Sequence, residues 1–375
     1  MKSFCKDIVH VFLTYVFNLF PVKYNKVVFN NFYGRGFGDN PKYIAKELLR
    51  SKVRYDLVWL LKNMDDDLPI GIRKVRYNRV RCAYEIATAR VIVSNVKGDL
   101  FFKKKKCQYY IQTWHGSFGL KYIEGEALKT LSKRYIRKSR FDSKQTDVFI
   151  SNSHLQSVEY RRALWCDSAI LESGSPRNDL LFSDVDKEQI KATLRISSGK
   201  KIVLYAPTFR DDKSIDCFDI CPQRVLKSLK ELTGDDWIMI VKMHPGLANA
   251  PSLFCNQEEV LDVTNHLDTQ ELLLISDILI SDYSSVMLDY VLLRRPIFIY
   301  ASDLSKYRAM RGLKPVFFDL PFSISQTVEE LISNILMFKE NDYQGKLSTF
   351  FNYYSPFDKG DASKQVMQLI ENYIN

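Results

Sequence analysis

Residues 278–293 read ILISDYSSVMLDYVLL. The stretch opens with the aliphatic composition of a buried strand, and a polar cluster follows at residues 281–285. Residues 286–293 then have the pattern of an amphipathic helix. A strand, a polar turn and a helix in this order form the repeating unit of a parallel sheet, so the stretch predicts an α/β fold.

The same order recurs on both sides of this stretch. Predicted strands cover residues 26–32, 56–61, 90–94, 109–113, 148–151, 169–172, 201–206, 237–243, 260–263, 278–281 and 297–300. Helical patterns separate many of them, which favours parallel sheets covered on both faces. The polar stretch 183–200 divides the series, so we predict two Rossmann-like domains, residues 1–185 and 186–375.

Polar clusters follow four of the predicted strands, at residues 114–116, 206–210, 242–245 and 281–285. Ligands of open α/β sheets bind at the carboxyl ends of the strands. Because these clusters come from both predicted domains, we expect a site in an interdomain cleft.

His115 is the first candidate for chemistry. It follows an apolar strand and lies beside two glycines, Gly116 and Gly119, whose backbone can approach a ligand closely. Imidazole can accept a hydroxyl proton near neutral pH, so His115 is a candidate general base. The alternative is a structural histidine.

Three further groups suit an anion. Arg210, after a strand end, can hold a phosphate through two parallel hydrogen bonds, although a surface salt bridge is the alternative. Lys242 and His244 stand two residues apart at another strand end, which suits a diphosphate. A histidine bonded to local backbone is the other interpretation.

The opening stretch supplies a fourth anion-binding candidate. Ser284 and Ser285 precede a predicted helix, whose free N–H groups and dipole favour phosphate. Asp289, one turn into that helix, could reach a ribose hydroxyl or orient the loop. Simple N-capping by Asp282 or Ser284 is the alternative.

Two patterns exclude common cofactor sites. Residues 34–38 have the spacing GxGxG, not GxGxxG, so a tight turn before a helix is favoured over a loop that faces acceptor or phosphate. The sequence has no GxxxxGK[ST] motif and no metal-ligand cluster. We therefore expect no cofactor and no metal, and we interpret the seven cysteines as reduced thiols.

Charge is distributed unevenly along the chain. The composition, with 46% hydrophobic and 26% charged residues, is that of a globular protein and excludes a disordered chain. The net charge is +10, but residues 1–200 hold 37 Lys and Arg against 20 Asp and Glu. This asymmetry indicates an anionic partner, either a membrane surface or an acidic polymer; nucleic acid is not expected because no motif for it occurs.

The basic residues fall into two candidate membrane or acceptor sets. A solvated face is the alternative for both. The sets are Lys103, Lys104, Lys105 and Lys106, and Lys133, Arg134, Arg137, Lys138 and Arg140.

Residues 8–20 form an apolar stretch that is too short to span a membrane, which needs roughly 20 residues. No small-residue cleavage site follows it, so a signal peptide is not expected. It is either a helix packed on the body or an interfacial helix. With the basic sets, it predicts a peripheral protein on the cytoplasmic face of the cell membrane.

Seven elements in order resemble the CDP-glycerol glycerophosphotransferase family of teichoic acid and capsule polymer synthesis. The resemblance runs from residue 26 to about residue 370. It rests on residues 40–44, 112–116, 151–153, 174–179, 206–210, 244–245 and 281–289.

The resemblance implies a GT-B architecture and transfer of glycerol phosphate from CDP-glycerol to a hydroxyl of a lipid-linked or polymeric acceptor, with release of CMP. It implies that His115 is the catalytic base, and we expect Arg210 and His244 to neutralise diphosphate charge. The substrate-binding residues it implies are His115, Gly116, Ser117, Phe118, Gly119, Arg177, Pro207, Thr208, Lys242, Met243, His244, Pro245, Ser284, Ser285 and Asp289.

Three alternatives stay open. The donor could be CDP-ribitol, because the family includes enzymes that use it. A GT-B transferase of a nucleotide sugar would share the architecture. A non-catalytic subunit that binds polyanions at a membrane would account for the charge without any reaction.

Overall fold

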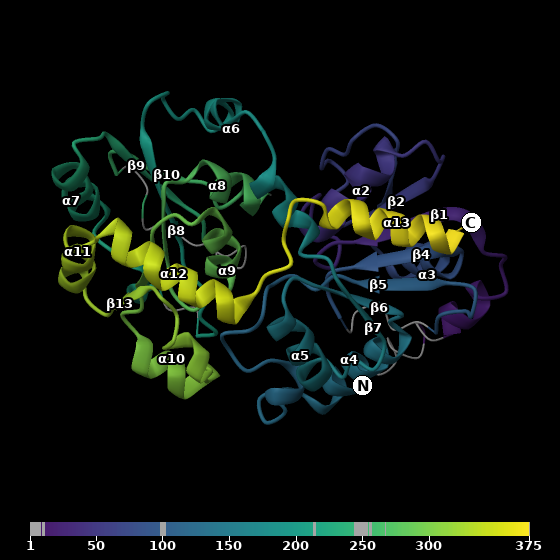
Figure 1. The fold of residues 1–375 in the computed structure, drawn as a ribbon. Helices are drawn as coiled ribbons and strands as arrows, with labels where there is room; N and C mark the ends of the chain where they lie inside the picture. The colour runs from purple at the N-terminus through teal and green to yellow at the C-terminus, as the bar shows by residue number, and fades with distance from the viewer. Residues whose placement is uncertain are drawn as a thin grey trace. The chain divides into compact units, whose positions relative to one another are not determined.

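The computed structural model describes residues 9, 12–97, 103–212, 215–243, 254, 257–266 and 268–374 (Figure 1). These residues form two compact α/β units. Unit 1 comprises Met1–Ser117, Ile123–Phe182 and Pro356–Asn375, and unit 2 comprises Phe118–Tyr122 and Ser183–Ser355. The prediction of two Rossmann-like units with parallel sheets is confirmed.

Unit 1 contains a seven-stranded parallel sheet in the order β3-β2-β1-β4-β5-β6-β7. Its strands are β1 (Lys23–Asn30), β2 (Asp56–Leu61), β3 (Ile72–Arg76), β4 (Ala89–Ser94), β5 (Tyr109–Gln112), β6 (Val148–Ser151) and β7 (Ala169–Glu172). Its α-helices are α2 (Asp39–Arg50), α3 (Arg79–Ala87), α4 (Lys133–Gln145), α5 (His154–Ala163) and α13 (Ala362–Ile374). The 3₁₀ turns are Glu124–Glu126 and Pro176–Phe182, and residues 12–17 are also helical.

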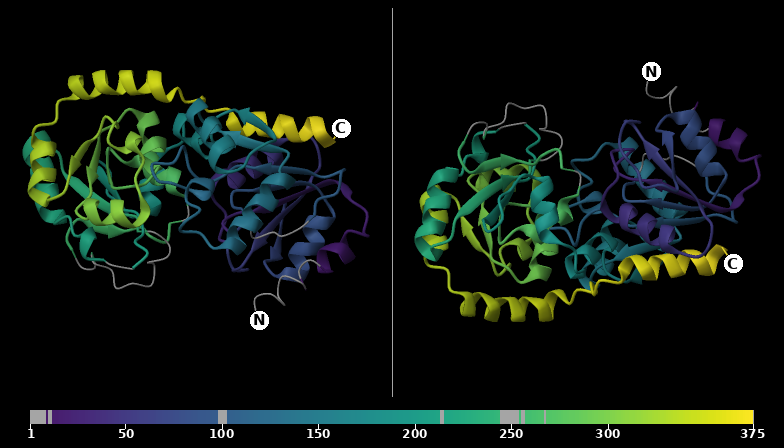
Figure 2. Two further views of the ribbon diagram at one scale, coloured as in Figure 1. Left: turned by 90° about the horizontal axis from the view of Figure 1, so that it is seen from below. Right: turned by 90° about the horizontal axis from the view of Figure 1, so that it is seen from above.

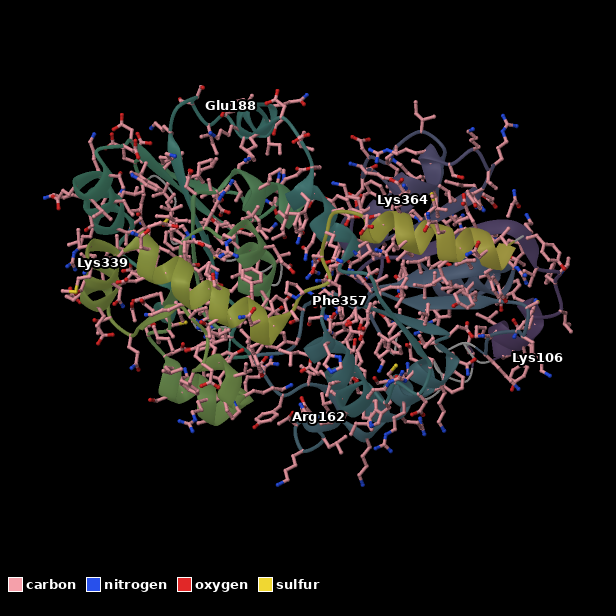
Figure 3. All side chains as sticks on the ribbon, viewed as in Figure 1. Lys106, Arg162, Glu188, Lys339, Phe357 and Lys364 are labelled. Atoms are coloured by element: carbon pink, nitrogen blue, oxygen red, sulfur yellow. The ribbon has the colours of Figure 1, made fainter. Side chains whose placement is uncertain are left out.

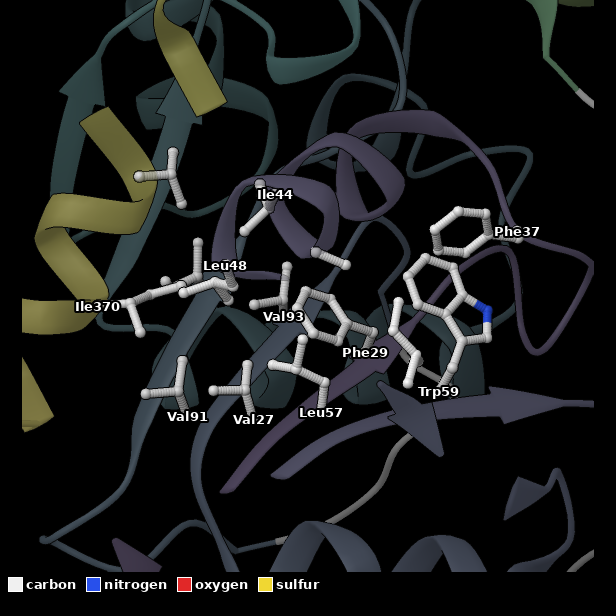
Figure 4. Close-up of a cluster of buried hydrophobic side chains, with 14 of the residues drawn as sticks. Val27, Phe29, Phe37, Ile44, Leu48, Leu57, Trp59, Val91, Val93 and Ile370 are labelled. Carbon is white, nitrogen blue, oxygen red and sulfur yellow. The ribbon is translucent and has the colours of Figure 1, made fainter. Parts of the chain in front are cut away.

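Alternation along the strands builds two hydrophobic layers in unit 1. Val27 and Phe29 of β1 face one layer, which α2 and α13 cover, whereas Val28 between them faces the layer covered by α3. Figure 4 shows the first layer, in which Ile370 of α13 lies near Leu48 of α2. Both faces are thus buried, as a parallel sheet requires.

Unit 2 contains a six-stranded parallel sheet in the order β10-β9-β8-β11-β12-β13. Its strands are β8 (Lys201–Ala206), β9 (Trp237–Val241), β10 (Val260–Asp262), β11 (Ile278–Ser281), β12 (Ile297–Tyr300) and β13 (Ser323–Ser325). Its α-helices are α6 (Lys187–Thr193), α7 (Pro222–Thr233), α8 (Thr269–Ile275), α9 (Val286–Tyr290), α10 (Leu304–Arg311), α11 (Val328–Leu336) and α12 (Glu340–Tyr354). Short 3₁₀ turns cover Asp216–Phe218, Val291–Leu293 and Pro315–Phe317.

The C-terminal segment differs from the sequence-based division. We placed residues 186–375 in one domain, but α13 packs in unit 1, where Val366 and Ile370 are fully buried beside Ile44. Figures 1 and 2 show this last helix, in yellow, lying along unit 1. The sequence pattern predicts the apolar face of α13, but it does not show that this face packs against α2, more than 300 residues away along the chain.

Two strands escaped the sequence analysis, and two others have limits that differ by more than one residue. β3 reads IRKVR, with three basic residues, and β13 has only three residues; each is the last strand at one edge of its sheet. Charged and short strands are common at edges, and they lack a strong apolar pattern. β1 covers Lys23–Asn30 instead of 26–32, and β9 ends at Val241 instead of residue 243.

Both sheets share one topological feature. The strand order reverses direction between β1 and β4 in unit 1, and between β8 and β11 in unit 2. Loops at the carboxyl ends of such strand pairs are the places where open α/β sheets bind ligands.

Candidate active site

The switch point of unit 1 is lined by amide side chains. Asn31 follows β1 and Asn95 follows β4, and both are buried. Asn95 Nδ2 donates a hydrogen bond of 2.8 Å to Asn31 Oδ1, and Phe32 N donates one of 2.9 Å to Asn95 Oδ1. The two loops are therefore fixed to one another by neutral groups.

His115 lies against this amide pair. Its Nδ1 is 2.7 Å from the main-chain oxygen of Asn95. A carbonyl oxygen can only accept, so Nδ1 carries the hydrogen and donates it. In the neutral ring Nε2 then holds the lone pair, which is the tautomer that a general base needs.

Burial lowers the pKa of His115 from its ordinary value of 6.5. The Asn95 carbonyl and the Asp39 carboxylate act in the opposite direction, but they do not outweigh the loss of hydration. The imidazole is therefore neutral at pH 7 and able to accept a proton. Sequence analysis identified His115 but could not identify its carbonyl partner.

The turn that presents His115 is held by three amide side chains. Trp114 has a φ of +53°, which is strained for a residue with a side chain. Its N–H donates to Gln112 Oε1 at 3.0 Å, and its carbonyl accepts from Asn40 Nδ2 at 3.1 Å. Gln156 Nε2 donates to the Gly116 carbonyl, two residues further along the chain.

The predicted 115–119 segment is divided between the two units. Ser117 belongs to unit 1, where its hydroxyl donates to Asn152 Oδ1 at 3.1 Å. Phe118 and Gly119 belong to unit 2, and the Phe118 ring packs edge-on against Tyr354, with 5.4 Å between the ring centroids. Substrate contact by these residues stays a prediction.

Arg177 is buried in unit 1 and paired. Its Nη1 lies 3.0 Å from Asp39 Oδ2, and its N–H donates to Asn40 Oδ1 at 3.1 Å. Both partners come from the start of α2, so Arg177 ties the 3₁₀ turn Pro176–Phe182 to that helix. Its predicted contact with CDP-glycerol is untested by this geometry.

The switch point of unit 2 has ionised groups in place of amides. Arg210 donates to Asp303 through Nε at 2.7 Å and through Nη2 at 2.9 Å, and Nη2 lies 2.9 Å from Asp282 Oδ2. Arg210 Nη1 donates to the Thr208 carbonyl, and its guanidinium lies over the Tyr283 ring, 4.9 Å from the centroid. The guanidinium is thus held in place by two carboxylates and an aromatic ring. Its predicted part in neutralising the diphosphate charge stays a prediction.

The loop after β8 carries Pro207 and Thr208 to the loop after β11. Thr208 N donates to Asp282 Oδ1 at 2.8 Å, and this bond crosses the switch point. Within the described part of the chain, the buried Thr208 hydroxyl has no hydrogen-bond partner. A buried hydroxyl without a partner is costly, so an oxygen of a bound ligand would suit it.

Ser284, Ser285 and Asp289 lie around the start of α9. Ser284 Oγ accepts a hydrogen bond of 3.3 Å from Val286 N, whereas the N-cap residue Ser285 makes no side-chain cap bond with the described residues, and both serines are partly exposed. Asp289 is buried and accepts a hydrogen bond of 3.2 Å from Gln270 Nε2. Asp282 Oδ1 accepts from both Thr208 N and Tyr283 N, so it joins the loop after β8 to the loop that leads into α9.

Lys242 follows β9 in the same unit. Its Nζ donates to the carbonyls of Thr264, at 2.9 Å, and His266. Burial lowers its pKa to about 8, although Asp268 and Asp262 act in the opposite direction. Met243 N donates to Thr264 Oγ1 at 3.1 Å. The predicted residues His244 and Pro245 lie outside the described residues.

The predicted basic sets are only partly solvent-facing. Lys104 Nζ is 2.9 Å from Asp147 Oδ1, and Lys105 Nζ donates to the carbonyls of Phe20 and Ala87 at 2.6 and 2.9 Å. Lys103 and Lys106 are exposed, and Figure 3 shows Lys106 at the margin of unit 1.

The second basic set lies on α4, which is a helix as predicted. Lys133, Arg134, Arg137 and Arg140 are exposed and Lys138 is half-buried. None of the helices in the described ranges has both the length and the apolar run needed to cross a membrane.

The fold and the site define a class: a two-unit α/β protein with a neutral histidine at one switch point and an ionised, polar loop pair at the other. The chain belongs to the CDP-Glycerol:Poly(glycerophosphate) glycerophosphotransferase family, whose profile matches residues 12–372. This match confirms the family resemblance noted in the sequence.

Individual relatives agree with the family. A teichoic acid poly(glycerol phosphate) polymerase of Staphylococcus epidermidis is 34% identical over 94% of this chain, which spans 51% of that protein. One of Bacillus spizizenii is 31% identical over 94% of this chain and 93% of its own length. The structure of a variant of the wall teichoic acid polymerase TagF soaked with CDPG superposes with a TM-score of 0.86 at 31% identity, covering 100% of this chain and 98% of that one. This similarity confirms the GT-B-like fold class.

Proposed function

We propose that this protein transfers glycerol phosphate from CDP-glycerol to a hydroxyl group of a polymeric or lipid-linked acceptor, with release of CMP. The observation that carries the proposal is the environment of His115, whose Nδ1 donates to the Asn95 carbonyl and whose Nε2 is left as the basic atom. Family membership supplies the donor class.

The proposed reaction balances without a cofactor. The acceptor hydroxyl oxygen attacks the phosphorus on the glycerol side, and its proton passes to Nε2 of His115. The bond between that phosphorus and the bridging oxygen breaks, and CMP leaves with the electron pair. The phosphorus centre is highly charged, so fixed donors that stabilise the leaving group lower the barrier.

The proposal divides the work between the units. Unit 1 supplies the base, and unit 2 holds the donor through the Thr208 hydroxyl, the backbone around Ser284 and Ser285, and Lys242. Arg210 pairs with Asp282 and Asp303 and so holds the loop that carries Thr208 in place. We therefore assign Arg210 to positioning this loop instead of direct phosphate contact.

The test is a donor screen that measures CMP or UDP release with and without a teichoic acid oligomer. Acceptor-dependent CMP release from CDP-glycerol supports the proposal. Faster CMP release from CDP-ribitol, or UDP release from a nucleotide sugar, assigns the protein to one of the rival transferases. No turnover of any donor by a folded, donor-binding protein favours a non-catalytic subunit.

We also propose that unit 1 docks on an anionic membrane surface. Phe17 and Phe20 pack edge-on or tilted against each other and against Tyr84, and this anchors the N-terminal segment to α3. Phe12 and Leu19 remain 65% and 86% exposed. The same segment bonds to Lys103 through Asn18 and to Lys105 through the Phe20 carbonyl. Exposed apolar side chains together with cations match an interfacial anchor, and each cation near an acidic leaflet adds about 1 kcal/mol.

Vesicle co-sedimentation tests the membrane proposal. Wild-type protein should sediment with anionic vesicles at low salt and less at 1 M salt, where the Debye length falls to about 3 Å. Lys133→Glu with Arg137→Glu should weaken sedimentation. The charge-matched control, Arg224→Glu with Lys227→Glu on α7 of unit 2, should not. Equal sedimentation of the two variants would contradict a specific role for α4.

A further inference from the structure

Asn95 makes contacts of two kinds at the switch point of unit 1. Its main chain accepts the hydrogen bond from His115 Nδ1. Its side chain bonds the other loop, with Oδ1 accepting from Phe32 N and Nδ2 donating to Asn31 Oδ1. The residue is fully buried, so these bonds are made away from bulk water.

The loop that Asn95 holds is conformationally strained. Phe32 and Tyr33 have φ values of +40° and +60°, a region that side chains disfavour. Such conformations cost of order 1–3 kcal/mol each and persist only where the surroundings impose them. Asn31 extends the restraint, because its Nδ2 donates to the Arg35 carbonyl at 2.7 Å.

The strained loop also contacts His115 through the Phe32 side chain. The Phe32 ring meets the His115 ring edge-on, with 5.3 Å between centroids and an interplanar angle of 60°. Asn95 therefore restrains His115 twice: directly at Nδ1, and indirectly through the side chain that packs on the imidazole. Tautomer and ring orientation are set by the same residue.

The charged groups that interact with His115 come from other elements. Asp39 and Glu124 favour the protonated ring and Arg177 disfavours it, while burial has the largest effect. The Asn95 side chain is bonded to none of these three groups by the contacts above. Its removal should therefore act on His115 through position and hydration alone.

We propose that Asn95 is the positioning residue of the general base, fixing the His115 tautomer through its carbonyl and the ring orientation through the Phe32 turn. This inference rests on the proposed function, because it takes His115 as the base. It identifies a functional residue outside every motif recognised in the sequence.

The experiment compares Asn95→Ala with Asn31→Ala and with the control Asn78→Ala. Asn78 is exposed and caps α3 by accepting from Arg81 N at 3.0 Å, so the control removes an asparagine hydrogen bond in the same unit. The readouts are kcat, donor KM, the acid limb of the kcat/KM–pH profile, and thermal stability.

Asn95→Ala should lower kcat by about 10- to 100-fold with donor KM nearly unchanged, because small misplacements of a catalytic group cost up to roughly 10²-fold. The released turn should admit water to His115 and raise its pKa, so the acid limb should move toward higher pH. Asn31→Ala should act in the same direction and more weakly, and the double variant should be no worse than Asn95→Ala alone.

Asn78→Ala should lower stability without moving the acid limb. Wild-type kcat and an unmoved acid limb in Asn95→Ala would overturn the inference, and so would a kcat loss that merely follows stability in all three variants. Should Asn95→Ala not fold, the acid limb of Asn31→Ala decides. Absence of CMP release by the wild type would instead refute the proposed function, and ¹⁵N titration of the His115 ring in each variant would still test Asn95.

Discussion

The two switch points have the same topology, but the groups that join their loops differ in charge. In unit 1 the loops are joined by neutral amides, with Asn95 bonded to Asn31 and to the Phe32 main chain. In unit 2 they are joined by ions, with Asp282 bonded to Thr208 N and paired with Arg210. Loss of hydration keeps the partly buried imidazole of His115 uncharged, whereas fixed charges and dipoles suit a site for a charged donor.

The largest expected effect falls on the unit with the neutral network. His115→Ala should lose transfer by about 10²-fold or more, because general-base catalysis contributes about 10²–10⁴. CDP-glycerol should still bind, since the proposed donor groups belong to unit 2. Single-turnover kinetics together with calorimetry separates the two quantities. Wild-type turnover in the folded variant would remove His115 from the mechanism.

The ionised network should dominate the stability of unit 2. Asp303→Asn leaves the buried Arg210 with a weaker partner and should cost about 3 kcal/mol, the lower range for breaking a buried ion pair. Asp211→Asn is the matched control, because its pair with Arg311 is about half exposed and should contribute less than about 1 kcal/mol.

Hydrogen exchange can assign both effects to a unit. Amides of β8 and β11 should lose protection in Asp303→Asn, while those of β1 and β4 should not. Equal effects of the Asp303 and Asp211 changes would show that burial of the Arg210 pair has no special energetic role.

Changes to Ser284 and Ser285, the proposed donor-binding residues at the start of α9, should have a smaller effect on donor binding. Ser284→Ala with Ser285→Ala should weaken CDP-glycerol binding by about 10-fold, which corresponds to one hydrogen bond to a charged group. If Ser284 only caps α9, the double variant should lose roughly 1 kcal/mol of stability and bind the donor as the wild type does. Titration calorimetry and thermal unfolding of the same sample distinguish the two roles.

The smallest expected effect concerns Lys242 and pH. Its pKa is lowered to about 8, so its charge is lost as the pH rises from 7 to 9, and donor affinity should fall a few-fold over this interval. The stability of the folded protein should instead increase as the pH rises. Between about pH 8 and the ordinary value of 10.5 the unfolded chain binds more protons than the folded one, so the burial penalty decreases as pH rises.

Lys242→Met is the control for both trends. It should flatten the pH dependence of donor affinity and remove the corresponding part of the stability trend, which isolates Lys242 from other groups that titrate in this range. A pH dependence identical to that of the wild type would exclude Lys242 from donor binding.

Sequence and structure agree where chemistry is local. Ser284 and Ser285 follow an apolar run and precede a helix, so their place at a strand end was predictable. His115 was identified by its glycine-flanked turn and by the family resemblance. In both cases the signal lies within about ten residues.

The remainder of the site depends on residues distant in sequence. Asp303 holds Arg210 from 93 residues away, and Asn95 contacts His115 from the loop after β4. Neither Asp303 nor Asn95 lies in a recognisable motif, because an acidic or amide side chain after a strand is too common to indicate a function. The sequence predicted that Lys104 and Lys105 belong to a set facing a membrane or an acceptor, with a solvated face as the alternative. In the structure Lys104 pairs with Asp147, and Lys105 donates to two main-chain carbonyls. Pairings of this kind are fixed by tertiary structure, which composition does not encode.

The most direct test of the contrast between the two switch points is a ¹⁵N NMR titration of the His115 imidazole, assigned by comparison with His115→Gln. The structure predicts a neutral ring at pH 7 with the hydrogen on Nδ1 and a pKa below 6.5. A ring protonated at pH 7, or a neutral ring with its hydrogen on Nε2, would contradict the account, because His115 could not then accept the acceptor proton through Nε2.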